Sequence, residues 1–307
     1  MAPLTRTLLI CITVVLLYKV LIRYPIYTAD SPIESTIPPV NVFPLPPSEA
    51  WETLRGQRFP AKLWQKSSSE ISERNQERIR SWRLHTPYLR HELLTDASAD
   101  EYVRERYGAY PELVEIYLSL QVPILKADVL RQLILYADGG IWSDLDVTCH
   151  AAIERWIPEP YRNATNVLVG IEFDGEQFAS WTVMAKPRSS HFAAVIRYIV
   201  AGLQESAAQY QTSISGLTMQ TISDVVNVTG PQAMTVAILE NLRLEMGEPV
   251  GFADLVNVTR PMLLQDVLVL PDAAFAASQA EWPKDRGEYL VEHHYEGSWK
   301  NEGGGYL

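Results

Sequence analysis

The sequence predicts an α/β domain in which a central, mostly parallel sheet is covered by helices on both faces. Short apolar runs typical of buried strands alternate with segments of helical periodicity from residue 59 to residue 270. A tether and stem would leave roughly 250 of the 307 residues for this domain, a normal size for one large domain. The composition, 47% hydrophobic and 21% charged, is typical of a globular chain.

The N-terminal part of the sequence differs from this pattern. Residues 8–17 carry no charge, so we expect a short N-terminal tail and a membrane anchor over 1–23, although Arg6 before this run and Lys19 and Arg23 after it do not fix the orientation. A cleaved signal peptide is the alternative, which the lack of a small-x-small cleavage site after Leu17 disfavours. Residues 24–58 are rich in proline and predict an extended stem, followed by a folded domain over 59–307.

The net charge, the cysteines and the possible glycosylation sites indicate which binding partners and which cellular compartment suit this chain. A formal net charge of -11 argues against a nucleic-acid partner, because phosphate backbones are bound by clustered lysines and arginines. The two cysteines, Cys11 and Cys149, do not make a disulfide scaffold. Three Asn-x-Thr triplets, at Asn163, Asn227 and Asn257, favour a lumenal location for the body, although such triplets also occur by chance.

The central helix illustrates how the elements are predicted. Pro123 suits the first helical turn, Leu125, Val129 and Leu133 follow at helical spacing, and the glycine pair beginning at Gly139 ends the helix. The same reasoning predicts strands over 59–65, 87–94, 141–144, 167–171 and 267–270, and helices over 69–84, 112–120, 123–137, 191–205 and 231–242.

The segment Asp144-Leu145-Asp146 is the main candidate for chemistry. Residues two apart in an extended chain point to the same side, so both carboxylates can approach one cation. Magnesium and manganese prefer oxygen ligands and leave positions open for phosphate oxygens. The same spacing is common in solvated loops, but here it follows a buried strand, where ligands of open α/β sheets bind.

Two more pairs of polar residues are candidates. Asp128 and Arg131 lie three apart on one face of the predicted helix, suited to sugar hydroxyls and phosphate respectively. A surface ion pair of small energetic value is the alternative. Glu172 and Asp174 flank one residue at a strand end and could form a second carboxylate pair facing the pocket, or simply be loop acids.

The segment from His293 to Lys300 concentrates histidines, a hydroxyl, an aromatic residue and a cation near the C-terminus. A histidine pair at a strand end is often only structural. The sequence contains no Gly-x-Gly-x-x-Gly, Walker-type loop, Gly-x-Ser-x-Gly or zinc-type Cys/His spacing.

The segment from Lys126 to Asp146 closely resembles the DXD-containing sugar transferases of glycosyltransferase family 32. Residues 60–65, the Thr229-Gly230-Pro231 element and the segment from His293 to Lys300 extend the resemblance. Within the family, the sequence is most similar to the fungal initiation-specific α-1,6-mannosyltransferases.

The resemblance implies a GT-A type nucleotide-sugar-binding fold, Mn²⁺ (or Mg²⁺) as cofactor, and GDP-mannose as donor. It also implies a single-pass type II Golgi membrane protein that transfers mannose with retention to a mannose hydroxyl of N-linked glycans, and a possible complex with other mannosyltransferases. The site residues it implies are Asp144, Asp146 and His294 for the metal; Trp64, Gln65, Trp142, Asp144, Ser298 and Trp299 for the nucleotide and diphosphate; and Asp128 and Arg131 for the donor sugar and phosphates. Glu172 and Asp174 are the candidate carboxylates for the face of the sugar.

Two alternatives stay open at this point. One is another retaining hexosyltransferase, for example a sphingolipid mannosyltransferase, which additional membrane spans would favour. The other is a non-catalytic subunit of a mannosyltransferase complex, which loss of either motif aspartate would favour; both Asp144 and Asp146 are present.

Overall fold

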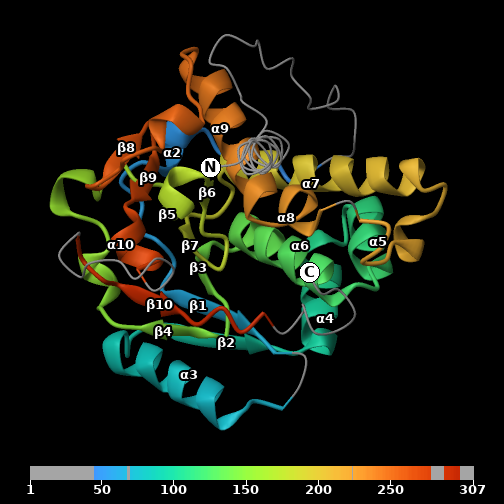
Figure 1. Ribbon diagram of the computed structural model, residues 1–307, viewed down its shortest axis with the longest axis horizontal. Coiled ribbons are helices and arrows are strands. Elements are labelled where there is room, and N and C mark those ends of the chain that lie inside the picture. Colours follow the sequence, from blue (N-terminus) through green and yellow to red (C-terminus); the bar gives the residue numbers. More distant parts are fainter. Residues whose placement is uncertain (1–44, 68–69, 223, 278–286, 298–307) are drawn as a thin grey trace, which may run out of the picture. The chain divides into compact units, whose positions relative to one another are not determined.

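The computed structural model describes residues 45–67, 70–222, 224–277 and 287–297. All of them lie within one compact unit, residues 39–307. This unit consists of a central sheet with helices packed on both faces (Figure 1). Its strands are β1 (Lys62–Lys66), β2 (Arg90–Leu94), β3 (Gly140–Ser143), β5 (Val167–Glu172), β6 (Gln177–Phe178), β7 (Thr182–Ala185), β8 (Met262–Leu264) and β9 (Val267–Leu270); β4 (Val147–Cys149) and β10 (Val291–His293) form a separate pair.

The main sheet has the strand order β2-β1-β3-β7-β5-β9-β8, with β6 pairing to β5. Strands β2, β1 and β3 are parallel to one another, as are β5 and β9. Strand β7 pairs antiparallel with both β3 and β5, so these five strands share one direction. The predicted α/β class with a mostly parallel sheet is therefore confirmed, with β7 and β8 as the reversed strands of this path.

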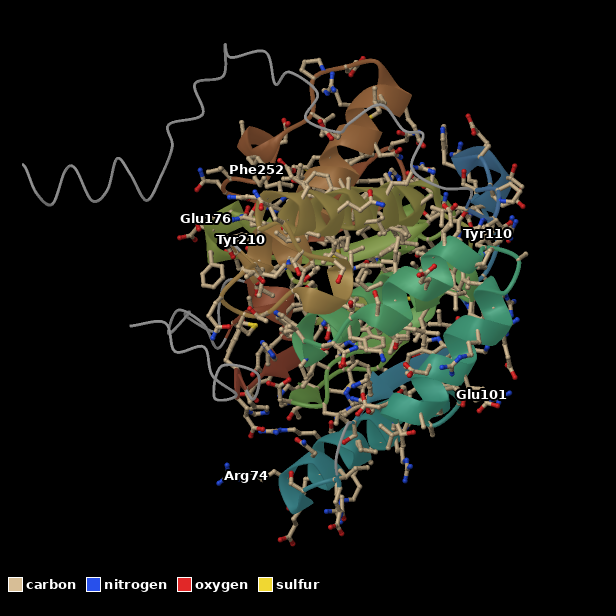
Figure 2. All side chains as sticks on the ribbon, turned by 90° about the vertical axis from the view of Figure 1, so that its right-hand side faces the viewer. Arg74, Glu101, Tyr110, Glu176, Tyr210 and Phe252 are labelled. Carbon is tan, nitrogen blue, oxygen red and sulfur yellow. The ribbon has the colours of Figure 1, made fainter. Side chains whose placement is uncertain are left out.

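The helices are α2 (Trp51–Leu54), α3 (Glu73–His85), α4 (Asp96–Tyr107), α5 (Pro111–Ser119), α6 (Pro123–Ala137), α7 (Ser190–Gln209), α8 (Val225–Val228), α9 (Pro231–Met246) and α10 (Asp272–Phe275). Helices α4 to α7 and α9 pack on one face of the sheet, whereas α3, α10 and the β4–β10 pair pack on the other (Figure 1). Polar side chains such as Arg74 on α3 and Glu101 on α4 are exposed (Figure 2).

Side-chain alternation along the strands explains why the sheet is covered twice. Val167 and Val169 on β5 join the core beneath α6, α7 and α9, while Leu168 between them joins the core beneath α3 and α10. The same division holds for Trp64 and Leu63 on β1. Strands buried on both faces read as continuous apolar runs, which is why they were recognisable in the sequence.

The structure describes only part of the N-terminal segment for which an anchor and a stem are predicted. The anchor predicted over 1–23 lies outside the described residues, as does most of the stem. The last part of the predicted stem contains α2, whose Leu54 is buried. The buried Lys186 donates from Nζ to the Leu54 carbonyl at 2.9 Å, which ties this helix to the body. Within the described part of the chain, no helix combines the length and apolarity needed to span a bilayer.

Candidate active site and metal centre

Strand β3 and the turn before it position the first motif aspartate. Gly139 and Gly140 adopt left-handed φ angles of 63° and 95°. A Cβ at either position would lie within 2.8 Å of a backbone atom, Ala185 O for Gly139 and Lys62 O for Gly140. The chain therefore turns sharply after α6 into β3, which is buried at every position and leads to Asp144 at the carboxyl edge of the sheet.

A chain of polar contacts runs from α6 to this aspartate. Arg131 donates from one guanidinium nitrogen to Asp128 Oδ1 at 3.0 Å and from the other to Asp144 Oδ1 at 3.1 Å. Thr229 Oγ1 donates to the second oxygen of Asp128 at 2.9 Å. The side chains of Asp128 and Arg131 are only 5% and 4% exposed, so the alternative of a surface ion pair does not apply.

Burying charged side chains costs free energy, and the pKa values of Asp128 and Arg131 reflect this cost. Burial raises the pKa of Asp128 to about 6, against the opposing effects of Arg131 and Thr229. Burial alone would lower the pKa of Arg131, but Asp144 and Asp128 together raise it above its ordinary value, so the guanidinium stays charged. A buried charge network of this kind contributes little net stability, which favours a binding role over a structural one.

Two further side chains orient Asp144. Trp142 donates from Nε1 to Asp144 Oδ1 at 2.7 Å, and Gln65 donates from Nε2 to the Asp144 carbonyl oxygen at 3.2 Å. Gln65 is fully buried, and its Oε1 has no hydrogen-bond partner among the described residues. Trp64, expected beside the nucleotide, is buried against Tyr102, and its Nε1 donates to the Gly139 carbonyl at 2.9 Å. It therefore supports the turn into β3.

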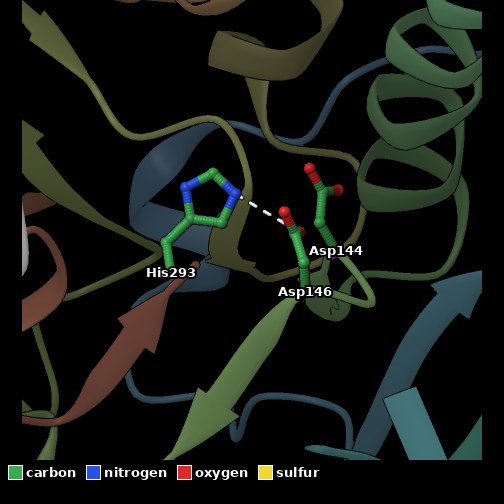
Figure 3. A group of neighbouring side chains, drawn as sticks. All are labelled: Asp144, Asp146 and His293. Atoms are coloured by element: carbon green, nitrogen blue, oxygen red, sulfur yellow. Dashed lines mark ion pairs between the residues drawn. The ribbon is translucent and has the colours of Figure 1, made fainter. Parts of the chain in front are cut away.

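The second motif aspartate lies opposite a histidine of β10. His293 Nε2 is 3.3 Å from Asp146 Oδ1 (Figure 3). Asp144, Asp146 and His293 each offer a ligand atom, and these atoms lie within 4.8 Å of one another. Burial tends to raise the pKa of Asp146, but the hydrogen bonds from His293 and from the backbone of Glu296 lower it below its ordinary value. Asp146 is thus held as a carboxylate.

This donor set fits a divalent cation. Two carboxylates and one imidazole supply three ligands for one ion, and they leave further coordination positions for a diphosphate. Each carboxylate oxygen has two lone pairs, so the hydrogen bonds to Asp144 and Asp146 do not exhaust their capacity. The weakest of these contacts, from Arg131 to Asp144 Oδ2, is 3.4 Å long.

The structure distinguishes the two adjacent histidines. The family resemblance implies His294 as a metal ligand, but the Nε2 of His294 lies 2.8 Å from Thr148 Oγ1, and its backbone N–H donates to the Asp146 carbonyl at 2.9 Å. His293 is the histidine grouped with the two aspartates, and its ring stacks on Trp181 with centroids 4.5 Å apart. Metal ligation by either histidine stays a prediction.

The segment that carries these histidines is attached to the site at several points. Strand β10 pairs antiparallel with β4, which directly follows Asp146. The Glu296 backbone N–H donates to Asp146 Oδ2 at 3.1 Å. The buried Arg78 of α3 donates to Glu296 Oε1 at 2.8 Å and to Asn75 Oδ1 at 2.7 Å. Sequence reasoning missed Arg78, because nothing in its local pattern shows that it meets a residue 218 positions later.

The structure separates Glu172 from Asp174. Glu172 ends β5 and is buried, and it accepts hydrogen bonds from Gln177 Nε2 at 2.6 Å and Trp181 Nε1 at 2.8 Å. Asp174 is exposed, because the strand ends at Glu172 and the next residues adopt left-handed φ angles, 53° at Phe173 and 55° at Asp174. The two acids therefore do not form one pair on one side of a strand. Ser298 and Trp299, also predicted for the site, lie outside the described residues.

A second group of potential ligands is structural. His191, Glu245 and Asp266 also bring ligand atoms within 4.8 Å of one another. His191 Nε2 lies 2.9 Å from Asp266 Oδ1, however, and its Nδ1 lies 3.1 Å from Asn241 Nδ2, so both ring nitrogens are engaged. Asp266 precedes β9 and therefore lies at the amino edge of the sheet, opposite the edge that holds Asp144.

Comparison with known proteins agrees with the site. Residues 72–163, which include Asp128, Arg131, Asp144 and Asp146, match the family described as a glycosyltransferase sugar-binding region containing a DXD motif. This segment belongs to that family. The family resemblance expected from the sequence is thereby confirmed for the part of the chain that supplies both motif aspartates.

Curated relatives of this DXD-containing chain are fungal. The chain is 30% identical over 263 residues to the initiation-specific alpha-1,6-mannosyltransferase of Schizosaccharomyces pombe, covering 80% of this chain and 64% of that protein. It is 25% identical to the enzyme of the same name from Candida albicans, covering 80% and 73%. Among solved structures, PaToxG glycosyltransferase matches with a TM-score of 0.44 and 15% identity over 61% of this chain and 72% of that one. The chain thus spans less than two thirds of the length of the S. pombe relative.

Proposed function

We propose that this protein is a metal-dependent glycosyltransferase that uses a nucleotide-sugar donor bound in a GT-A type arrangement. The observation that supports the proposal is a continuous set of contacts from the buried Asp128 and Arg131 to the half-buried Asp144, beside the Asp146–His293 pair. Such a site offers a charged guanidinium for phosphate, carboxylates for a cation and a carboxylate for sugar hydroxyls. The family description of residues 72–163 supports the same reading.

In this proposal each residue of the site has a separate role. A divalent cation bound by Asp144, Asp146 and His293 would neutralise negative charge on the departing diphosphate. Arg131, fixed between two carboxylates, is a preorganised cation beside the same phosphates. Asp128 is held by Arg131 and Thr229 so that its carboxylate can accept hydrogen bonds from donor-sugar hydroxyls. Glu172, immobilised by Gln177 and Trp181, is the acidic group for the sugar face.

The finer proposal is transfer of mannose from GDP-mannose, with retention, to a mannose hydroxyl of N-linked glycans in α-1,6 linkage. The names of the S. pombe and C. albicans relatives support the sugar and the linkage. We propose Mn²⁺ as the cation, because carboxylate ligands suit it and it accepts an imidazole. We also propose a type II Golgi membrane protein, supported by the uncharged N-terminal run and the Asn-x-Thr triplets.

A donor panel tests the proposal. Full-length protein in detergent would be incubated with Mn²⁺, a mannoside acceptor and either GDP-mannose or UDP-sugars, and the products would be analysed by mass spectrometry. We expect mannosyl transfer that a chelator abolishes and added Mn²⁺ restores. Asp146→Ala should lower kcat by about a hundredfold or more, because the cation contributes several kcal/mol to the transition state. Absence of transfer from every donor, or full activity of Asp146→Ala under chelation, would refute it.

A further inference from the structure

A small cavity opens at the carboxyl edge of the sheet, beside the candidate donor site. Its volume is about 80 Å³, and its lining includes Asp174, Asn257, Thr259 and Asp272. Asp272 begins α10, separated by one residue from the end of β9, and Ile171, which also lines the cavity, precedes Glu172 at the end of β5. Because β5 and β9 are parallel neighbours, their carboxyl ends place the cavity next to the buried Glu172.

Ring contacts of Trp181 connect the region of this cavity with the metal-facing group. Trp181 donates to Glu172 Oε2 at 2.8 Å, and its ring centroid lies 6.0 Å from that of Phe275 on α10, the helix that begins with Asp272. The same Trp181 ring stacks on His293 at 4.5 Å and meets Tyr295 edge-on at 6.3 Å. The tyrosine ring also meets His293 edge-on, with centroids 4.0 Å apart. The cavity thus adjoins the place where a donor sugar would react.

The chemistry of the lining selects the class of ligand. Asp174 and Asp272 are acceptor-only groups, each able to receive several hydrogen bonds. Thr259 and Asn257 can both donate and accept, and Ile171 provides an apolar wall. Among the described residues that line the cavity none is cationic, so it disfavours phosphate and suits uncharged hydroxyl groups. Neither acid belongs to a group of three potential metal ligands in the described chain.

We propose that this cavity is the acceptor subsite, where Asp272 accepts hydrogen bonds from hydroxyl groups of a neutral hexose and Asp174 closes the outer rim. This rests on the proposed glycosyltransferase function and extends it by locating the acceptor and naming the residue that recognises it. The volume admits several hydroxyl groups or waters but not an oligosaccharide, so the cavity holds part of one sugar ring. Asp272 then acts as a specificity-determining residue, and it would set which hydroxyls of the acceptor are recognised.

Asp272→Asn tests this while keeping the shape of the side chain. The acceptors would be methyl α-mannoside and its singly deoxygenated analogues, with GDP-mannose and Mn²⁺ saturating. In the unchanged protein, kcat/KM for one analogue that lacks a non-reacting hydroxyl should be about 10- to 100-fold lower than for the parent mannoside. This is the loss expected when a charged acceptor no longer receives its hydrogen bond. With Asp272→Asn, kcat/KM for the parent mannoside should fall by a similar factor, whereas kcat/KM for the deoxy analogue should fall no further.

Controls separate this result from misfolding. Glu101→Gln removes one exposed negative charge on α4 (Figure 2) and should leave acceptor kinetics unchanged. Binding of GDP with Mn²⁺, measured by calorimetry, and the melting temperature should be the same in Asp272→Asn as in the unchanged protein. If Asp272→Asn has unaltered acceptor kinetics, or loses the same factor with every acceptor including the deoxy analogue, the inference is wrong.

A binding measurement keeps the inference distinct from the proposed function. Saturation-transfer NMR would report contact of methyl α-mannoside with the protein without any reaction. Mannoside binding that is lost in Asp272→Asn, together with no transfer from any donor, would refute the enzyme proposal and support the subsite. Transfer by both proteins with equal mannoside binding would support the enzyme and overturn the subsite.

Discussion

Asp128 allows ligand binding to be separated from folding, because it is buried yet carries a charge. Its carboxylate accepts from Arg131 at 3.0 Å and from Thr229 at 2.9 Å. Asparagine has the same shape and keeps one acceptor oxygen for these donors. We expect Asp128→Asn to lose about 10- to 100-fold in kcat/KM for transfer, because a charged acceptor for sugar hydroxyls contributes on the order of 1.5–3 kcal/mol. Its stability should change little.

The stability estimate follows from the pKa of Asp128. Burial raises that pKa from its ordinary value of 3.8 to about 6. At about 1.4 kcal/mol per pKa unit, keeping this group ionised at neutral pH costs roughly 3 kcal/mol. Asparagine removes this cost but replaces charge-assisted hydrogen bonds with neutral ones, a loss on the order of 1–2 kcal/mol. The two effects nearly cancel, so the melting temperature should stay within roughly 5 °C.

The sign of the pH dependence follows from the same shift. Between pH 3.8 and about 6 the folded carboxyl binds more protons than the unfolded one, so the free energy of unfolding contributed by Asp128 falls as pH rises through this window. Melting curves of metal-free, donor-free protein from pH 4 to 7 would measure it. Asp128→Asn should lack this component. A melting temperature more than about 10 °C lower in the variant, or the same pH dependence of the melting temperature in both proteins, would refute the reasoning.

The remaining predictions concern the C-terminal segment. His293→Ala should raise the Mn²⁺ concentration needed for half-maximal activity about tenfold or more, whereas His294→Ala should raise it less, because only His293 is grouped with the two aspartates; equal shifts in a metal titration would contradict this. Arg78→Gln and Glu296→Gln should each weaken Mn²⁺ activation, because their ion pair fixes the backbone N–H that donates to Asp146. The double variant should lose no more than either single one, and fully additive losses would show that the pair is not coupled.

Elements with strong local signals were predictable. Helix α6 begins at Pro123 and ends before the glycine pair, as its spacing indicated. Helix α4 was not singled out, since only Ala99, Val103 and Tyr107 of its residues are buried and its capping partner is a serine, Ser98, instead of the usual acid. The antiparallel strand β7 has four residues, and its place between β3 and β5 depends on pairing partners that a short apolar run does not specify.

The same distinction between local signals and long-range pairing applies to the site residues. The Asp128–Arg131 pair and the position of Asp144 at a strand end were predictable, because helical spacing and the end of an apolar run follow local rules. The identity of the metal-facing histidine was not, since it depends on the register of β10 against β4, which pairs His293 with Val147. Asp174 illustrates a third case. Consecutive left-handed residues at Phe173 and Asp174 turn its side chain away from Glu172, and neither residue type signals such a turn by itself.

The two aspartates of the motif are fixed by different parts of the fold. Asp144 is held by Arg131 and Trp142, which come from the adjacent helix and strand. Asp146 is held by His293 and by the backbone of Glu296, which is 150 residues away in sequence. A cation shared by both aspartates would therefore link the body to the segment that follows β10. Cation binding and attachment of that segment must then favour each other by the same free energy, because such coupling is reciprocal.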